Sequence, residues 1–166
     1  MRVDKKEKII DNAVEIFAKN GYFKTTTALI AKAAGVTQPY IFHFFKNKEE
    51  LFNSVIDRAY QRINETFFGV EAPPDRLFET MGSAFMQIMQ SHRDETILIM
   101  QAHTISEPII KEHVKEKFRL IYETVLAKFT NAGLSNPEAA TSQFIGTGLL
   151  ITVSEVLELP QLLCFD

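Results

Sequence analysis

The sequence contains little cysteine and no long apolar run. One of its 166 residues is a cysteine, Cys164, which excludes a disulfide framework and a cysteine-based zinc site. The charged N-terminal stretch lacks the apolar centre of a secretory signal. The longest uninterrupted apolar runs, such as residues 97–100, fall far below the roughly 18 residues that span a bilayer. We therefore expect a cytoplasmic protein with no membrane partner.

Motifs for catalysis and metal binding are also missing. His92, His103 and His113 fall on different expected helices, and the pair Glu112-His113 does not extend to the HExxH zinc motif. The chain has no glycine-rich phosphate loop and no nucleophile elbow around a serine. We expect a protein that is not an enzyme and holds neither a cofactor nor a metal.

The composition is that of a soluble globular protein, with 46% hydrophobic and 23% charged residues. Apolar residues recur at helical spacing almost from end to end, and strict alternation is hard to find, so the fold class is all-α. Asp4 and Glu7 form a capping-box pattern, and Asn20-Gly21 ends the first helix. Helices are expected at about 4–19, 27–34, 38–44, 48–69, 75–91, 94–105, 109–131 and 138–157.

Charge is divided unevenly along the chain. Residues 1–62 carry 11 Lys and Arg against 7 Asp and Glu, whereas the remainder is acidic enough to bring the whole chain to a net charge of −3. Gly69 and the pair Pro73-Pro74 separate the two regions. This asymmetry favours a basic head that binds a polyanion, joined to a body with another task. A chance asymmetry on a solvated surface is the alternative.

Two short expected helices joined by the sequence AAGV form a helix-turn-helix pattern. Ala31 and Ala34 are small where the helices cross, and Gly35 supplies the turn. The second helix presents its polar and aromatic residues outward, where glutamine can pair with adenine, and proline and tyrosine can contact a thymine methyl. An ordinary helical hairpin with polar caps is the alternative. The candidate base-contacting residues are Gln38, Pro39, Tyr40 and His43.

Hydroxyls and lysines flank the same two helices. Free backbone N–H groups at a helix N-terminus bind phosphate, and a threonine placed there adds a hydroxyl. Lysines at the start of the next helix add positive charge. The candidate phosphate-contacting residues are Thr26, Thr27, Thr37, Lys46 and Lys48.

The run AVEIFAKNGYFKTTTALIAKAAGVTQPYIFHFFKNKEELF, within residues 9–52, resembles the DNA-binding head of the TetR family of bacterial transcriptional regulators. The resemblance covers about the first 60 residues, and many spaced residues match at once. It implies that Thr26, Thr27 and Lys48 contact phosphates. It also implies that Gln38, Pro39 and Tyr40 face bases. The chain departs from many members at Phe42, His43 and Phe44, and Ala28 stands where some members have a base-reading arginine.

The resemblance implies an all-α fold in which a three-helix helix-turn-helix head is joined by a long helix to a ligand-binding and dimerisation body. Residues 1–47 would form the head and residues 48–166 the linking helix and body. The implied function is that of a homodimeric repressor on a near-palindromic double-stranded DNA operator. Its two recognition helices would lie about one DNA turn apart, at ~34–36 Å. A small hydrophobic or aromatic effector would release the operator.

Large, soft and aromatic side chains mark the expected body helices. Such a stripe is more often plain core than a ligand cavity, but the resemblance implies an effector pocket among the middle helices. Gln101 and His103 could orient a mostly apolar ligand. The candidate wall residues are Phe85, Met89, Met100, His103, Phe118 and Tyr122.

The last two expected helices are apolar on more than one side, which would leave an exposed apolar strip on a monomer. A two-fold dimer through a four-helix bundle is the favoured interpretation, and a helical monomer is the alternative. The candidate interface residues are Phe144, Ile145, Gly148, Leu149, Thr152 and Val156. Two rival functions remain: an enzyme using the body cavity, and a helical interaction protein whose degenerate head no longer reads DNA.

Overall fold

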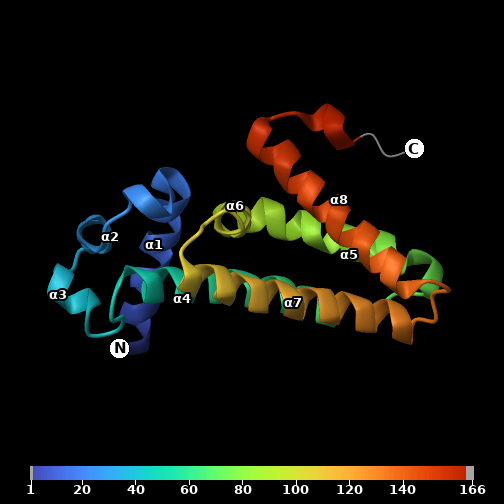
Figure 1. Cartoon of the computed structure of the whole chain (residues 1–166), viewed down its shortest axis with the longest axis horizontal. Helices are drawn as coiled ribbons and strands as arrows, with labels where there is room; N and C mark the ends of the chain where they lie inside the picture. Colours follow the sequence, from blue (N-terminus) through green and yellow to red (C-terminus); the bar gives the residue numbers. More distant parts are fainter. Residues whose placement is uncertain (1, 164–166) are drawn as a thin grey trace.

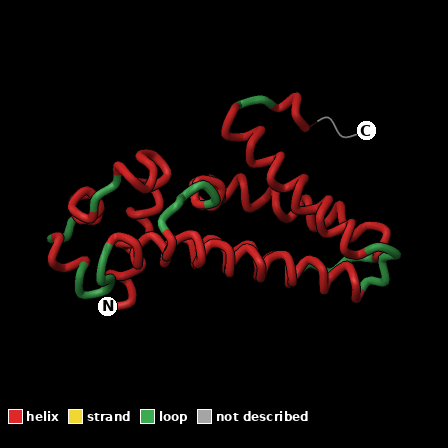
Figure 2. The backbone as a smooth tube through the Cα atoms, viewed as in Figure 1, coloured by secondary structure: helices red, strands yellow, loops and turns green. Residues whose placement is uncertain are grey.

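The computed structural model describes residues 2–163, and every regular element in that range is helical (Figures 1 and 2). The expected all-α class is thus confirmed. Cys164 lies outside the described residues. The helices are α1 Arg2–Lys24, α2 Thr27–Ala34, α3 Gln38–Ile41, α4 Lys48–Gly69, α5 Pro74–Ser91, α6 Arg93–Ala102, α7 Pro108–Asn131 and α8 Pro137–Leu157, followed by a short 3-10 helix, Pro160–Leu163.

Helices α1 to α3 form a three-helix head whose turns follow from local chemistry. Thr26 Oγ1 accepts the N–H of Leu29 at 3.2 Å and so begins α2. Gly35 ends α2 at φ 67° and ψ 36°, in the left-handed region that side chains disfavour. Pro39 needs no intrahelical N–H in the first turn of α3. The chain therefore reverses between α2 and α3 as the sequence predicts.

The first helix differs from its expected bounds. It begins at Arg2, so the prediction that Asp4 and Glu7 form a capping box at its start was wrong. At the other end the helix breaks at Gly21, where φ is 73° and ψ is 167°, and then continues to Lys24. Thr25 fixes this extra segment because its hydroxyl donates to the carbonyl of Gly21 at 2.8 Å. The expected stop at Asn20-Gly21 is therefore a kink.

The recognition helix is also shorter than expected. Helix α3 ends at Ile41, and residues 42–44 continue as turns. Phe45 is buried, and its N–H bonds to the carbonyl of Ile41 at 3.1 Å. This anchor leads the chain back into the core before α4 begins.

Helix α4 connects the head to the body. Asn47 Oδ1 accepts the N–H of Glu50 at 2.8 Å, while Glu50 Oε2 accepts the N–H of Lys46, also at 2.8 Å. This exchange fixes the start of the helix. An apolar stripe along α4 is buried at Leu51 in the head and still buried at Phe67 in the body. One continuous rod of helix therefore contacts both parts.

The body is built from α4 to α8. Helix α7 runs alongside α4, while α5 and α8 lie on the opposite side of the body and the short α6 sits between α1 and α5 (Figure 1). The buried apolar residues form one cluster that extends from Ile9 in the head to Ile151 in α8. Because α1 packs on both α4 and α6, the head is held directly against the body.

Helix α8 is unusually apolar for its position. An 18-residue window within its 21 residues has a mean hydropathy of 1.2, but only 22% of that window is buried. By length and composition alone it is apolar enough to cross a membrane, a property that core helices of soluble proteins share. The length of uninterrupted apolar runs does not reveal this helix, because serine, threonine and glycine recur among its apolar residues.

Candidate functional site

The outer face of α3 and the turn after it present polar and aromatic side chains to solvent. Tyr40 is half-buried, and its ring meets the rings of His43 and Phe44 edge-on, with centroids 5.8 and 5.4 Å apart. Phe42 is 48% exposed, a large apolar ring on the surface beside polar neighbours. The exposed members of this face are Thr37, Gln38, Pro39, Phe42 and His43.

Helix α2 holds Gln38 in place. Gln38 Nε2 donates to Thr27 Oγ1 at 2.8 Å, and Thr27 itself is buried. The hydroxyl of Thr26 caps α2. Both threonine hydroxyls therefore have structural partners. The groups at this helix start that suit a phosphate are the backbone N–H groups of its first turn. Contact between Thr26, Thr27 and DNA stays a prediction.

The two candidate lysines occupy different surroundings. Lys48 Nζ donates to the Tyr22 carbonyl at 3.0 Å and lies 4.2 Å from the centroid of the Tyr22 ring. Burial, with a smaller contribution from nearby Glu49, raises the pKa of Tyr22 to about 12. Lys46 is exposed. Lys48 therefore ties the start of α4 to the end of α1, whereas Lys46 is available to an external anion.

An apolar cavity lies in the body. Its volume is ≈ 90 Å³, and α4, α5, α6, α7 and α8 all contribute to its wall. Its main polar feature is a hydrogen bond of 3.1 Å between the Tyr60 hydroxyl and His103 Nε2. The lining residues are Tyr60, Ile63, Phe67, Phe78, Gly82, Phe85, Thr96, Ile99, Met100, His103, Phe118, Ile121, Phe144, Ile145, Thr147, Gly148, Leu149, Ile151 and Thr152.

The predicted wall residues divide into two groups. Phe85, Met100, His103 and Phe118 border the cavity. Met89 and Tyr122 are not among its lining residues. Met89 lies one turn further along α5, buried beside a second cavity that Arg93 and Glu155 also line. Tyr122 is half-buried on α7.

Gln101, the other polar candidate, lies away from the cavity lining. Its Nε2 donates to the carbonyl of Ala18 at 3.4 Å. Because Ala18 belongs to α1, Gln101 links α6 to the head. His103 is the candidate that borders the cavity.

The six predicted interface residues do not form one exposed strip, so that expectation was wrong. Phe144 and Thr152 are buried within the protomer. A Cβ atom on Gly148 would lie 3.7 Å from the ring of Phe85. These three residues follow one another at intervals of four, so they share the inward face of α8. Ile145 also borders the cavity.

The outward face of α8 carries a different set of residues. Leu149 is 36% exposed and Val156 is 45% exposed. A Cβ atom on Gly146 would meet nothing within 4 Å. A helix that is apolar on all sides gives no sequence signal for which side faces the core. We name this surface the α8 outer stripe, and its residues are Ser142, Gly146, Leu149, Val153 and Val156.

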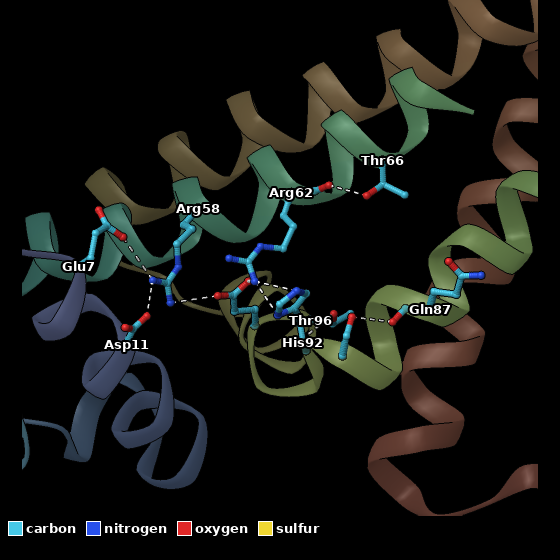
Figure 3. Close-up of polar contacts among 10 residues, drawn as sticks. Glu7, Asp11, Arg58, Arg62, Thr66, Gln87, His92 and Thr96 are labelled. Atoms are coloured by element: carbon cyan, nitrogen blue, oxygen red, sulfur yellow. Dashed lines mark hydrogen bonds and ion pairs between the residues drawn. The ribbon is translucent and has the colours of Figure 1, made fainter. Parts of the chain in front are cut away.

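A charged network joins α1, α4 and α6 (Figure 3). Arg58 of α4 reaches Asp11 Oδ1 of α1 at 2.6 Å and Glu95 Oε1 of α6 at 3.0 Å. Arg62 reaches Glu95 Oε2 at 3.3 Å and His92 Nε2 at 2.9 Å. The Glu95 side chain is 7% exposed. Arg58 therefore contacts the head and the cavity helix at once.

Sequence patterns did not single out Tyr60, Arg58 or Glu95. Tyr60 fits the apolar stripe of α4, and its hydroxyl is the one signal that separates it from the aliphatic residues there. Arg58 and Glu95 are 37 positions apart and become neighbours through the fold. Within the described residues, no group of three or more potential metal ligands forms.

A helix-turn-helix head with an exposed polar face, set on a helical body with an apolar cavity, is the architecture of helix-turn-helix transcriptional regulators. Residues 9–55 match the family described as bacterial regulatory proteins, tetR family. The match to the TetR family of bacterial transcriptional regulators therefore covers the head of the chain. The curated relatives that it matches are named as transcriptional regulators.

Individual relatives support this assignment. The chain is 29% identical over 131 residues to the uncharacterized HTH-type transcriptional regulator YhgD of Bacillus subtilis, covering 77% of this chain and 69% of that protein. Its fold matches AibR, solved with isovaleryl coenzyme A and operator DNA, with a TM-score of 0.75, 18% identity, and coverage of 90% and 86% of the two chains. It also matches SmeT, solved with triclosan, with a TM-score of 0.76, 21% identity, and coverage of 97% and 84%.

Proposed function

We propose that this regulator is a homodimeric repressor that binds a near-palindromic DNA operator and leaves it when a small hydrophobic or aromatic effector enters the body cavity. Residues 1–47 would bind DNA, and residues 48–166 would hold the effector and the dimer contact. The solved relatives AibR, with its acyl-coenzyme A and operator DNA, and SmeT, with triclosan, support the two kinds of partner.

The observation that carries the proposal is the double role of α6. Thr96, Ile99 and Met100 face the cavity. Glu95, in the first turn of the same helix, binds Arg58, which also binds Asp11 of the head. A ligand that moves α6 must therefore strain or shift the contacts that position α1. This provides a physical route from the cavity to the DNA-binding face.

The size of the cavity sets the direction of the change. A volume of ≈ 90 Å³ is smaller than the about 150 Å³ of a cavity that holds benzene. An effector with one ring therefore pushes the helices around the cavity apart. The ligand can favour release only to the extent that it binds the released arrangement more tightly, and DNA weakens ligand binding by the same factor.

The α8 outer stripe is the proposed dimer contact. Ser142, Gly146, Leu149 and Val156 are exposed in the protomer and Val153 is half-buried, and Gly146 permits close approach of a second helix. A dimer would place two recognition helices about 34–36 Å apart, which is one turn of B-DNA. A near-palindromic operator would match this symmetry.

The direct test of the function is a binding measurement on DNA. A duplex selected from a random pool by the purified protein is labelled and titrated by fluorescence anisotropy, with a scrambled duplex as the control. We expect the selected duplex to bind at least about 10³-fold more tightly than the scrambled one. Equal affinity for both would contradict the repressor and favour a helical interaction protein with a degenerate head.

The dimer is tested on the α8 outer stripe. Gly146→Arg places a charge at an exposed site where a Cβ has free space, so the protomer should fold normally. We expect light scattering to show a dimer for the unmodified protein and a monomer for the variant, because an unpaired charge is costly in an interface. Gln87→Arg, at an exposed position of α5, is the matched control and should stay dimeric. A monomeric unmodified protein at micromolar concentration would contradict the dimer.

A further inference from the structure

The cavity wall carries no formal charge at neutral pH. None of its lining residues is a lysine, arginine, aspartate or glutamate. Two of its hydroxyls are occupied within their own helices, because Thr96 donates to the carbonyl of His92 and Thr152 to that of Gly148. A ligand carboxylate or phosphate would thus lose its water without gaining a cation, which is strongly unfavourable.

One neutral polar pair is available to hold a head group. The Tyr60 hydroxyl and His103 Nε2 lie 3.1 Å apart, and both side chains border the cavity, Tyr60 from α4 and His103 from just after α6. Burial raises the pKa of Tyr60 and lowers the pKa of His103. Both side chains are therefore neutral at pH 7. The ring of Phe118 packs edge-on against His103, with centroids 5.0 Å apart, which restricts the imidazole.

We propose that the cavity selects an uncharged hydrophobic molecule with one hydroxyl, a phenol or an alcohol, whose hydroxyl inserts between Tyr60 and His103. A hydroxyl both donates and accepts, so Tyr60 can donate to it while it donates to the imidazole nitrogen. Both partners then keep a hydrogen bond. An ester or a ketone accepts but cannot donate, and a carboxylate adds a buried charge. This inference rests on the proposed effector role of the cavity.

The volume limits the ligand further. At ≈ 90 Å³ the cavity takes up one ring or a short chain only with the outward movement of the helices described above, and a long acyl chain would require a much larger movement. The body therefore favours small phenols and alcohols over acyl-coenzyme A thioesters, whose charged phosphates find no partner on this wall. A matched series of probes is 4-ethylphenol, ethylbenzene and 4-ethylbenzoate.

The test is calorimetric titration of the full-length protein, without DNA, with each of the three probes. We expect 4-ethylphenol to bind about tenfold more tightly than ethylbenzene, the gain typical of a neutral hydrogen bond, and 4-ethylbenzoate to bind most weakly. The double variant Tyr60→Phe/His103→Phe removes both hydrogen-bond partners, so it should remove the advantage of the phenol while leaving the affinity for ethylbenzene largely unchanged. Tyr122→Phe removes a hydroxyl that does not border the cavity and should change nothing.

Other outcomes overturn the proposal. It fails if none of the probes binds, if the benzoate binds as tightly as the phenol, or if the double variant weakens phenol and ethylbenzene equally. The proposed function is judged separately, by adding each probe to the complex with the selected duplex. Release of DNA by the benzoate would keep the effector function and reject the ligand class. Phenol binding without release would do the reverse.

Discussion

The geometry of the head and that of the body are determined by different kinds of interaction. In the head, single residues set the geometry: Thr26 and Asn47 cap helices, and Gly35 turns the chain at a positive φ. In the body, long apolar helices pack around a cavity with few local signals. The comparison shows why a short motif identifies the DNA-binding part, whereas the ligand site depends on how whole helices rotate against one another.

The junction between the head and the body is the charged network of Asp11, Arg58, Arg62 and Glu95. It has the charged contacts of a surface, yet the Glu95 side chain is 7% exposed. Arg58 and Arg62 of α4 both approach this carboxylate, so α4 holds α6 while it also holds α1 (Figure 3). Head and body therefore share a fixed contact through which movement of one can reach the other.

The largest effect is expected at this junction. Arg58→Ala removes a partner of a buried carboxylate and should lower the free energy of unfolding by about 3 kcal/mol, the low end for a broken buried pair because Arg62 remains. Urea denaturation followed by circular dichroism measures the change. Arg119→Ala is the control, since Arg119 is exposed and pairs within α7. An equal effect of the two variants would show that the junction adds no special stability.

The next effect concerns the face of α3. Tyr40→Ala should weaken binding to the selected duplex by about 1–3 kcal/mol and relax its sequence preference, because it removes a candidate base contact. Fluorescence anisotropy on the selected duplex and its single-base variants measures both. Phe68→Ala removes an exposed ring at the far end of α4 and should bind normally. Unchanged preference in Tyr40→Ala would reject this residue as a base contact.

Lysine substitutions sharpen the difference between positioning and reading. Lys46→Ala should weaken binding to all duplexes alike and lower the slope of log affinity against log salt by about 1. Lys48→Ala should also reduce thermal stability, since Lys48 bonds to the Tyr22 carbonyl. Anisotropy at several salt concentrations and a thermal melt separate the two. A slope that Lys46→Ala leaves unchanged would remove Lys46 from the phosphate contacts.

Glycine substitutions compare the two regions directly. Gly82→Ala, within α5, should stabilise the fold by up to about 1 kcal/mol, because a Cβ there meets nothing within 4 Å and alanine favours helix. Gly35→Ala should destabilise it by about 1–2 kcal/mol, because its φ is +67°. Thermal melts of both variants give the signs. Destabilisation by Gly82→Ala would mean that α5 has no room for the added methyl group.

The smallest effect is a pH dependence in the body. The pKa of His103 is lowered in the fold, so as pH falls through about 6.5 the unfolded chain binds the proton first. His103 therefore costs stability below that pH, and His103→Gln should lose less stability between pH 7.5 and pH 5 than the unmodified protein. Denaturation curves across this range measure the slope. Identical slopes would show that His103 titrates normally.

Sequence patterns predicted the head more completely than the body. The caps at Thr26 and Asn47 and the turn at Gly35 act within a few residues, so the spacing alone locates them. The sequence predicts that the first helix ends at Gly21, whereas the structure has a kink there. The segment after the kink is held by the Thr25 hydroxyl, which donates to the Gly21 carbonyl, and the local pattern does not indicate this bond. The shortened α3 depends on burial of Phe45, which the local sequence does not specify.

In the body, helix positions were predicted well and helix rotations were not. Helices α5, α7 and α8 start within one residue of their expected positions, because proline and asparagine mark the boundaries. Phe144 faces inward and Val156 outward, a choice that tertiary packing makes when both sides of α8 are apolar. Met89 is buried on α5 beside a second cavity and does not border the first one. Tyr60 borders the cavity because α4 packs against α6, a contact between distant segments that no local pattern predicts.

If the cavity and the head are coupled, the effector and the DNA must change each other's affinity by the same factor. The affinity of 4-ethylphenol is measured by titration calorimetry for the free protein and for its complex with the selected duplex. We expect phenol to bind the complex more weakly, by the same factor by which phenol weakens DNA binding, and we expect this factor to be lost in Arg58→Ala. Equal phenol affinity for the free and DNA-bound protein would contradict it.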